Sequence, residues 1–451
     1  MPYTFKGGIH VDEHKITCAC PTEILSSVPA VRISMSQGIG APCSPVVSVG
    51  DSVSVGQIIG DTAPDALGCP VHSSVAGKVT AIDTVRTPSG QNECLISIEN
   101  DFSDTVSDSV VPYSATLNEL SPDDIISRVR RAGVVGMGGA AFPAYAKISS
   151  ARGKSELLIV NCAECEPYIT ADHRLLLESP ERVVRGVKLL MRAVGAPHAF
   201  IAVEDNKLDA VARLREVCAG DSLVSVKILR TKYPQGDERQ LIFALTGREI
   251  PAGKLPADAG CVIFNAHTCA AVWDAVADGM PLVRRTVTVS GDCVAEPKNL
   301  SVPLGTPASY LLDFCGGLVR VPSRLISGGP MMGQAQWNAE MNVKKGTSSL
   351  LYLSGEACGE GVRESACIRC GRCVSHCPMH LMPVYIANSV RADDMKSAET
   401  YGAMSCVECG SCSFGCPAKV ELVQYIRVAK NHIRTEKARM KAAEAESRRD
   451  K

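Results

Sequence analysis

Two cysteine runs near the C-terminal end of the chain have the residue types and spacing of iron–sulfur cluster ligands. Each run has three cysteines at steps of three residues, then a fourth cysteine four residues later, directly before a proline. The runs consist of Cys367, Cys370, Cys373 and Cys377, and of Cys406, Cys409, Cys412 and Cys416. In modules of this kind, the three close thiolates hold one cube and the fourth reaches across to the other. The runs therefore predict two [4Fe-4S] clusters.

The crossed pattern divides the eight thiolates into two ligand sets. We expect cluster A to be held by Cys367, Cys370, Cys373 and Cys416. We expect cluster B to be held by Cys406, Cys409, Cys412 and Cys377. Two zinc sites or a disulfide knot are the alternatives, but zinc sites usually show two separated cysteine pairs instead of such a run. A two-cluster module carries single electrons, so the rest of the chain should supply or remove them.

Length and composition limit the number of domains, the kinds of partner and the cellular compartment that fit this chain. The 451 residues suffice for several domains, and the net charge of −1 gives no reason to expect a nucleic-acid partner. The chain has 21 cysteines, and the 13 outside the two runs are scattered, which fits the reducing cytosol of an anaerobe better than a disulfide framework. We expect no signal peptide and no transmembrane span, although a peripheral membrane association is compatible with the sequence.

Residues 1–110 form the first predicted domain, which is all-β. Two stretches, Pro45–Gly60 and Val71–Ile82, alternate apolar and small residues between glycine turns. They resemble the two halves of the barrel-sandwich fold of lipoyl and biotinyl carrier domains. The hairpin tip between the halves lacks the lysine that carriers modify, so we expect an unmodified docking domain. Cys69 and His72 at this tip are interpreted as turn residues in preference to a redox or metal pair.

Residues 121–282 form the second predicted domain, which is α/β, after a Ser/Asp-rich linker over 101–120. Ser121 before Pro122 marks a helix start. Helical patterns then alternate with apolar runs that predict buried strands at Glu156–Asn161, Ala199–Val203, Val224–Leu229 and Cys261–Phe264. This alternation indicates a mostly parallel sheet that is covered on both faces.

The remaining residues predict three smaller units. Residues 283–355 contain an alternating strand and the glycine loop Ile326–Gly333, and resemble a ubiquitin-like β-grasp domain of the soluble-ligand-binding (SLBB) type. Residues 356–420 hold the α-helical two-cluster module. Residues 421–451 form a basic helical tail, for which a solvated surface helix is favoured over docking on a partner or an anionic membrane. The expected fold is thus multidomain, α/β plus β.

A glycine-rich stretch in the α/β domain has the composition of a ligand-binding loop. Gly133, Gly136, Gly138 and Gly139 allow the backbone to approach a phosphate or a flat ring and to turn its N–H groups towards it. The spacing is neither a Rossmann fingerprint nor a P-loop. Two further polar stretches, beginning at Asn161 and Tyr233, directly follow predicted strands. Because the carboxyl ends of parallel strands meet at one edge of a sheet, these stretches should converge there.

Three segments, Gly136–Lys147, Asn161–Pro167 and Tyr233–Glu238, resemble the FMN- and NADH-binding segments of the flavoprotein subunit of respiratory complex I. The resemblance implies non-covalent FMN contacts from Gly136, Gly138, Gly139, Lys147, Asn161, Glu164, Tyr233, Gly236, Asp237 and Glu238. It places Phe142 and Glu166 on the nicotinamide side.

The sequence departs from the complex I pattern at three points. Ala163 stands where that family has aspartate, and Met137 occupies the place of an arginine. One of the family's two paired asparagines is matched by Asn265, which is included among the FMN contacts, while Phe264 replaces the other.

The order of the domains along the whole chain resembles the RnfC family, together with Phe5–His10, Gly328–Gly333 and the first cysteine run. This family comprises the NADH-handling subunits of the membrane Rnf complex. The resemblance implies electron transfer between NAD(H), FMN, two [4Fe-4S] clusters and partner subunits with further clusters or membrane spans, within a ferredoxin:NAD oxidoreductase that pumps ions. It also implies a peripheral position on the cytoplasmic face of the cell membrane.

Because the cofactors would supply the chemistry, we expect no catalytic acid–base triad in this chain. Two alternatives share the flavin and cluster modules: a soluble cobalamin-reductase-like protein, in which the barrel-sandwich domain is C-terminal, and a proline-reductase-linked protein. An alternative of another class is a non-enzymatic iron–sulfur adaptor, which would contain iron and sulfide but no FMN.

Overall fold

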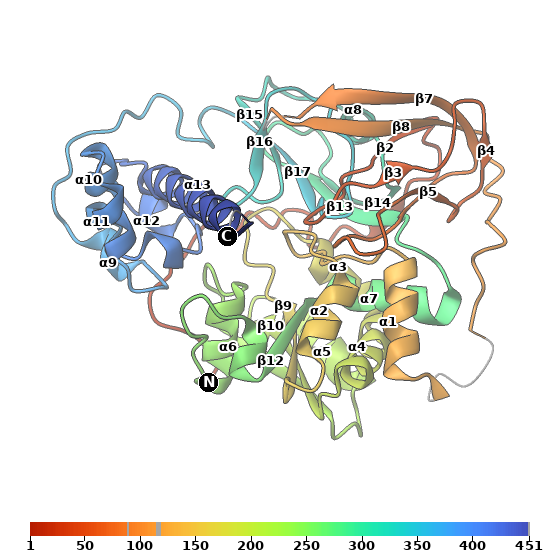
Figure 1. Ribbon diagram of the computed structural model, residues 1–451, viewed down its shortest axis with the longest axis horizontal. Coiled ribbons are helices and arrows are strands. Elements are labelled where there is room, and N and C mark those ends of the chain that lie inside the picture. The colour runs from red at the N-terminus through yellow and green to blue at the C-terminus, as the bar shows by residue number, and fades with distance from the viewer. Residues whose placement is uncertain (88–89, 114–118, 450–451) are drawn as a thin grey trace.

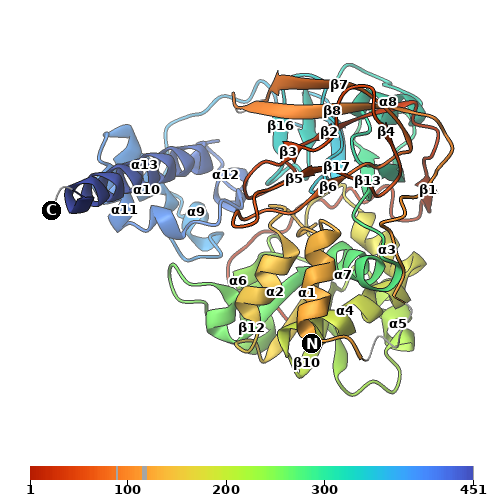
Figure 2. The ribbon, with the colours of Figure 1, turned by 45° about the vertical axis from the view of Figure 1, so that its right-hand side comes forward.

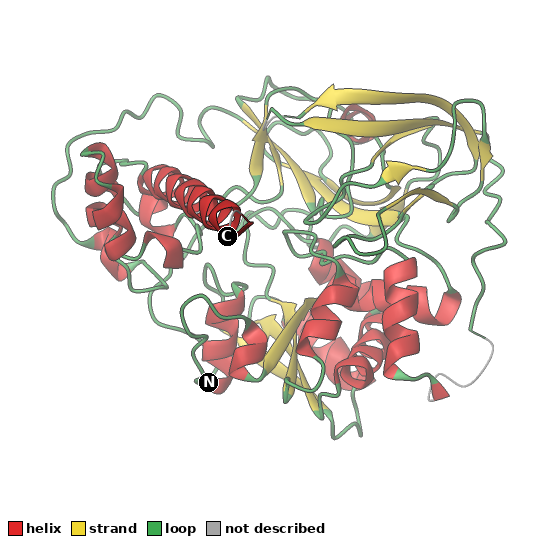
Figure 3. Cartoon of the chain, viewed as in Figure 1, coloured by secondary structure: helices red, strands yellow, loops and turns green. Residues whose placement is uncertain are grey.

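The computed structural model describes residues 1–87, 90–113 and 119–449. Part of the predicted linker, residues 114–118, lies outside the described residues. Figure 1 shows three regions: the β-strands of two domains lie together, the α/β domain lies beneath them, and a helical module lies to one side. The same division is visible in Figure 3, where strands fill the upper region and helices the side module. The multidomain fold predicted from the sequence is confirmed.

Two small sheets form the barrel-sandwich domain. The first has the order β2-β8-β7-β4 and consists of Ala30–Ser34, Asn92–Asn100, Gly77–Arg86 and Ser52–Val53. The second has the order β3-β5-β6 and consists of Ser44–Pro45, Ile58–Asp61 and Val71–His72. Neighbouring strands are antiparallel, and alternate residues such as Ile33 and Ile98 are fully buried between the sheets.

The residues ahead of β2 connect other parts of the molecule. Tyr3 forms a parallel bridge with Leu229 and Ile9 an antiparallel bridge with Tyr233, both at the edge of the α/β domain. Strand β1 (Thr22–Ile24) then joins the sheet of the β-grasp domain. This N-terminal segment therefore ties the α/β and β-grasp domains together.

The α/β domain has a four-stranded parallel sheet, as predicted, in the order β11-β10-β9-β12. Its strands are Val224–Leu229, His198–Glu204, Leu157–Cys162 and Cys261–Asn265. Its helices are α1 (Pro122–Arg131), α2 (Ala144–Ala151), α3 (Ala171–Glu178), α4 (Pro180–Val194), α5 (Leu208–Val217), α6 (Glu238–Thr246) and α7 (Ala266–Trp273). One face packs against a large core that includes Ile125 and Leu190, and the other against α6 through Leu241 and Ile242. Both faces are thus covered, and strands β9 and β12 carry buried apolar residues on both sides.

The β-grasp domain has a mixed sheet in the order β1-β14-β13-β17-β15-β16. Its strands after β1 are β13 (Arg284–Ser290), β14 (Lys298–Pro303), β15 (Arg324–Ser327), β16 (Gln334–Gln336) and β17 (Ser349–Leu353), and its helix is α8 (Ala308–Phe314). Val287 and Leu300 of this sheet belong to the same apolar core as Ile33 and Ile98 of the barrel-sandwich domain. The two β domains therefore pack as one unit.

The cysteine-rich module is helical. Its elements are α9 (Arg372–Ser375), α10 (Pro383–Arg391), α11 (Met395–Thr400), α12 (Ser411–Phe414) and α13 (Leu422–Arg449). Helix α13 packs through Ile426, Ala429 and Ile433 against α10 and α11. Beyond Ile433 it runs outwards, with mostly exposed side chains over residues 434–444 (Figure 2). Among the described residues, none of the helices is long and apolar enough to cross a membrane.

The two cysteine runs repeat their backbone conformation as well as their sequence. Left-handed φ angles occur at Arg369 and Glu408, which have the same place in their runs, and again at Gly371 and Gly410. The Arg369 N–H donates to the Cys367 sulfur at 3.4 Å, and the Glu408 N–H donates to the Cys406 sulfur at 3.3 Å. Backbone N–H groups turned towards sulfur are typical of iron–sulfur ligand loops, because they stabilise negative charge on the thiolates.

Candidate flavin and iron–sulfur sites

The polar segments of the α/β domain meet at the carboxyl edge of its sheet, as predicted. Asn161 at the end of β9 is the direct neighbour of Asn265 at the end of β12. The Asn161 amide donates to the Gly236 carbonyl at 2.8 Å, which joins the loop after β11 to the same edge. Two of the three predicted contact segments, and Asn265, are therefore adjacent in space.

The glycine loop closes over this edge. A bridge between Val135 and Pro143 forms its base, and the Gly136 N–H donates to the Phe142 carbonyl at 2.8 Å. A Cβ atom on Gly138 would lie 3.1 Å from the Asn265 Cβ, while one on Gly139 would meet nothing within 4 Å. The loop thus touches the strand ends at one glycine and leaves exposed backbone open at the next, which fits the cradle of a phosphate-bearing ligand.

A cationic side chain lies beside the glycine loop. The Lys147 ammonium forms an ion pair with Glu238 at 2.5 Å and lies 5.7 Å from the centroid of the Phe264 ring. Both partners of the ion pair are partly exposed, so an incoming ligand can reach them. Lys147 and Glu238 are two of the residues for which the sequence predicts FMN contacts.

Glu164 occupies a half-buried position at the same edge. Its carboxylate accepts the Asp172 N–H at 2.6 Å, and its backbone has a left-handed φ of 50°. The Lys15 ammonium supports this strained turn by donating to the carbonyls of Glu164, Glu166 and Ile169 at 2.6–2.9 Å. Burial raises the pKa of Glu164 to about 7, against the opposing effect of Lys15. Lys15 of the N-terminal segment therefore holds the loop that follows β9 in one conformation before any ligand binds.

Three predicted contact residues use their side chains within the protein. The Glu166 carboxylate accepts the N–H groups of Met331 and Met332, at 3.0 and 2.9 Å, from the glycine loop of the β-grasp domain. The Tyr233 hydroxyl donates to the Cys409 carbonyl at 2.7 Å. The Asp237 carboxylate caps α6 by accepting two backbone N–H groups. Contacts of these residues with a nucleotide stay predictions.

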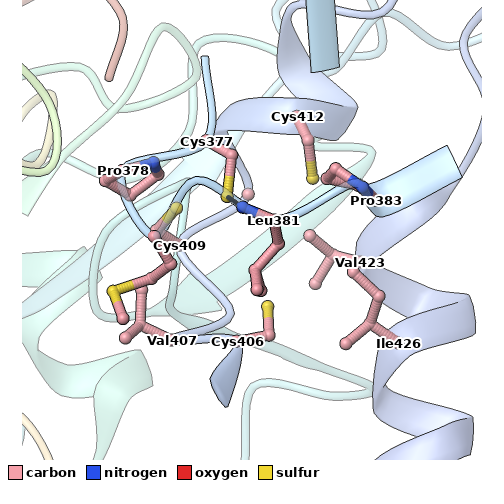
Figure 4. A pocket seen from close by; sticks show the side chains of 12 residues that line it. Cys377, Pro378, Leu381, Pro383, Cys406, Val407, Cys409, Cys412, Val423 and Ile426 are labelled. Atoms are coloured by element: carbon pink, nitrogen blue, oxygen red, sulfur yellow. Dashed lines mark hydrogen bonds between the residues drawn. The ribbon is translucent and has the colours of Figure 1, made fainter. Parts of the chain in front are cut away.

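The four cysteines assigned to cluster B line one pocket in the helical module. Cys377, Cys406, Cys409 and Cys412 surround it together with Leu381, Pro383, Val407, Val423 and Ile426. Figure 4 shows their side chains around this pocket, with Cys377 arriving from the other run. An apolar pocket with thiols from both runs fits a cubane held by crossed ligation.

The four cysteines assigned to cluster A lie nearer the surface. Cys367 and Cys370 are exposed, whereas Cys373 and Cys416 are half-buried. Burial raises the pKa of Cys373, and the nearby thiols of Cys416 and Cys367 raise this pKa further. Thiols of both runs therefore approach each other here too. Among the described residues, no three His, Cys, Asp or Glu side chains are arranged to hold a single metal ion, whereas in a cubane each thiolate binds a different iron.

The pocket lined by the four cysteines assigned to cluster B also lies against the α/β domain. Tyr233, Ile9 and Cys409 form one apolar contact, which Met331 and Val407 extend. The Gly8 N–H donates to the His376 carbonyl at 2.9 Å, so the N-terminal segment touches both the α/β domain and the residue before Cys377. The helical module therefore docks on the flavin-type edge through its cluster B side.

Some residues of this region were not predicted from the sequence. Asp172 accepts the Asn265 amide at 2.6 Å, and Thr268 accepts the Met137 N–H at 2.9 Å. Arg285 of β13 donates to the Met137 carbonyl at 2.8 Å. Only Arg285 had a local signal, because strand alternation places it on the same buried face as Val287.

Family models match the chain in the order of these domains. They describe the RnfC barrel sandwich hybrid domain over residues 3–103, the Nuo51 FMN-binding domain over 129–274, the SLBB domain over 286–335 and the 4Fe-4S dicluster domain over 366–421. This set of domains defines a flavin- and iron–sulfur-type electron-transfer oxidoreductase.

Comparison with individual relatives assigns the chain to one family within this class of oxidoreductases. The chain is 45% identical over 433 residues to a subunit of the Na(+)-translocating ferredoxin:NAD(+) oxidoreductase complex of Acetobacterium woodii, covering 95% of this chain and 97% of the relative. It is 45% identical to a subunit of the proton-translocating ferredoxin:NAD(+) oxidoreductase complex of Clostridium ljungdahlii, covering 98% and 96%. The chain belongs to the RnfC family, as the resemblance predicted. A solved NAD+-reducing [NiFe]-hydrogenase chain shares the fold at 21% identity and a TM-score of 0.50, over 68% of this chain and 61% of that one.

Proposed function

We propose that this chain passes electrons between NAD(H) and two [4Fe-4S] clusters, by way of FMN, as a subunit of an ion-translocating ferredoxin:NAD+ oxidoreductase complex. The observation that carries this proposal is the docking of the cluster B pocket on the edge of the sheet that holds the glycine loop. The names of the two relatives at 45% identity support the same activity.

The glycine loop, Lys147 and the strand ends would hold the flavin. We assign the phosphate to the exposed backbone of Gly138 and Gly139 and to Lys147, and the ring and ribityl groups to the edge formed by Asn161 and Asn265. When bound, FMN exchanges two electrons with NAD(H) and single electrons with iron–sulfur clusters. The protein's part is to orient the ligands and to exclude water; the cofactor supplies the redox chemistry.

The burial of the thiols supports an order for the two clusters. Cluster B lies against the flavin-type edge through Tyr233 and Cys409, so it would be the nearer cluster. Cluster A has two exposed ligands, Cys367 and Cys370, so it would exchange electrons with a partner protein. The partners would be the other subunits of the complex, and the proposed position of this chain is peripheral, on the cytoplasmic face of the membrane.

Cofactor analysis of the full chain tests the proposal. Anaerobic purification should yield about eight irons and eight sulfides per chain with one FMN, as two cubanes and one flavin require. Addition of NADH should bleach the flavin absorbance and then the cluster absorbance. A protein with the full iron and sulfide content that binds no FMN and is not bleached by NADH would instead be an iron–sulfur adaptor.

A further inference from the structure

Arg285 reaches from the β-grasp domain to the glycine loop of the α/β domain. It is the second residue of β13 and is only 2% exposed. Its Nη2 donates to the Met137 carbonyl and its Nε to the Thr347 carbonyl, both at 2.8 Å. A single guanidinium therefore fixes the backbone of the loop between Gly136 and Gly138, from a different domain.

One nitrogen of this guanidinium has no acceptor. Arg285 Nη1 is buried and finds no hydrogen-bond partner among the described residues. Buried polar groups are almost always paired, and a guanidinium carries five N–H donors in a fixed fork. His267 Nε2, which lies 3.5 Å from Asp172, is likewise without a hydrogen-bond partner in the described part of the chain. An unpaired donor behind a candidate binding loop points to an acceptor that arrives with a ligand or with water.

Arg285 also supplies a positive charge beside two carboxylates of this region. After burial, Asp172 and Glu164 have the largest effects on the pKa of Arg285, and both raise it. Arginine keeps its charge under all ordinary conditions, so this cation is permanent. The Met137 backbone has a second anchor, because its N–H donates to Thr268 at 2.9 Å, but Thr268 carries no charge.

We propose that Arg285 is a further positioning residue of the flavin site, which fixes the glycine loop through the Met137 carbonyl and raises the reduction potential of the bound flavin. The proposal rests on the proposed FMN site at this loop. Reduction makes the flavin more negative, and a fixed positive charge nearby favours the more negative form. The two anchors of Met137 therefore have separable effects: both hold the loop, and only Arg285 acts on the potential.

The test compares Arg285→Gln with Arg284→Gln. Arg284 is the matched control because it lies on the same strand but donates to the carbonyls of Leu25 and Ser301, away from the glycine loop. The measurements are the FMN dissociation constant of the flavin-free full chain, from flavin fluorescence, and the flavin midpoint potential under anaerobic conditions. Arg285→Gln should weaken FMN binding by about tenfold, as loss of a buried charge-assisted hydrogen bond would. Arg285→Gln should also lower the flavin midpoint potential. Arg284→Gln should have the same FMN dissociation constant and the same midpoint potential as the wild type.

A third variant separates anchoring from charge. Thr268→Val removes the uncharged anchor of Met137 and should weaken FMN binding while it leaves the midpoint potential unchanged. Arg285→Lys keeps the charge but not the fork, so it should retain most of the potential and lose part of the affinity. If Arg285 had only a structural role, Arg285→Gln would lower the unfolding temperature of the flavin-free protein but would leave the midpoint potential of the bound FMN unchanged.

Three outcomes distinguish a failure of the proposed role of Arg285 from a failure of the proposed function of the chain. FMN affinity and potential in Arg285→Gln equal to those in Arg284→Gln would overturn the positioning role. If Arg285→Gln does not fold, Arg285→Lys decides, and an affinity equal to that of Arg284→Lys overturns it. A wild-type chain that binds no FMN would overturn the proposed function itself, which distinguishes the two failures.

Discussion

The hydroxyl of Tyr233 offers a direct test of how the flavin-type edge and cluster B are connected. Tyr233 is 1% exposed, and its hydroxyl donates to the backbone carbonyl of Cys409 at 2.7 Å. Tyr233→Phe removes this hydrogen bond but keeps the ring and its packing against Ile9. The substitution therefore changes one polar contact of the docked helical module and little else.

The size of the effect follows from the burial of this contact. A buried carbonyl that loses its donor costs about 1–3 kcal/mol. Converted at about 1.4 kcal/mol per factor of ten, this shifts the balance between docked and undocked module by about 5- to 150-fold. Because electrons can pass between the flavin site and cluster B only when these are close together, we expect the transfer step to slow while the reaction with NADH does not.

Anaerobic stopped-flow spectroscopy with NADH separates the two steps. In Tyr233→Phe, flavin bleaching should proceed as in the wild type, and the cluster phase that follows should be slower, by at most the factor of about 5 to 150 by which the docking equilibrium shifts. Tyr352→Phe is the matched control, since Tyr352 is also buried and donates to a carbonyl, that of Ala308, within the β-grasp domain. Equal cluster phases in wild type and Tyr233→Phe would refute the reasoning, and a slower flavin phase would assign the hydroxyl to nucleotide binding instead.

Three further predictions follow from cluster ligation and from burial. Cys409→Ala should lose about half of the iron and sulfide and keep its FMN, as measured by chemical analysis, because one cubane would lose a ligand. The same variant should fail to reduce a cluster-dependent acceptor. The control variant Cys218→Ala should keep all cofactors and reduce the acceptor. Gly7→Ala should disturb cluster B, seen in its electron paramagnetic resonance spectrum, because the new Cβ would lie 2.7 Å from the carbonyl of a cluster B ligand. Gly153→Ala shares the left-handed backbone, with its cost of about 1–2 kcal/mol, but meets nothing within 4 Å and should leave that spectrum unchanged. Glu166→Gln should flatten the pH dependence of thermal unfolding between pH 4.5 and about 7.

The sign of the Glu166 prediction follows from proton linkage. Burial raises the pKa of Glu166 from 4.5 to about 7, so the folded protein holds a proton there that the unfolded chain has already lost. The free energy of unfolding contributed by this group therefore falls as the pH rises through that window. The unfolding temperature of the wild type should fall relative to that of Glu166→Gln over the same range. A difference between the two that is constant with pH would contradict the assignment.

Local patterns in the sequence were sufficient to predict the main sheet and to propose the cluster ligands. The steps between Cys367 and Cys377 are a property of one short segment, and the second run repeats them. The convergence of Asn161 and Asn265 could also be expected, because parallel strands must end at a common edge. In both cases the geometry of a single element, or of one sheet, is enough to bring the side chains together.

Contacts between domains could not be predicted in this way. The Tyr233 hydroxyl and its acceptor are 176 positions apart, and Arg285 and the Met137 carbonyl are 148 positions apart. No local period encodes such pairs, because they depend on how two finished domains dock. Tyr233 was therefore predicted only as a nucleotide contact, although the structure turns its hydroxyl towards Cys409. The glycine loop was recognised by composition, but its anchors were not.

The two cysteine runs show how docking makes equivalent sites different. Their backbones repeat the same left-handed positions and the same N–H to sulfur bonds, so the runs alone specify two alike clusters. Yet Cys409 is buried where its counterpart Cys370 is exposed. The difference comes from neighbours outside the module, since Tyr233 and Ile9 cover the cluster B side and nothing comparable covers Cys370 among the described residues. We therefore propose that the α/β domain and the N-terminal segment set the order of the clusters, which ligand spacing alone does not specify.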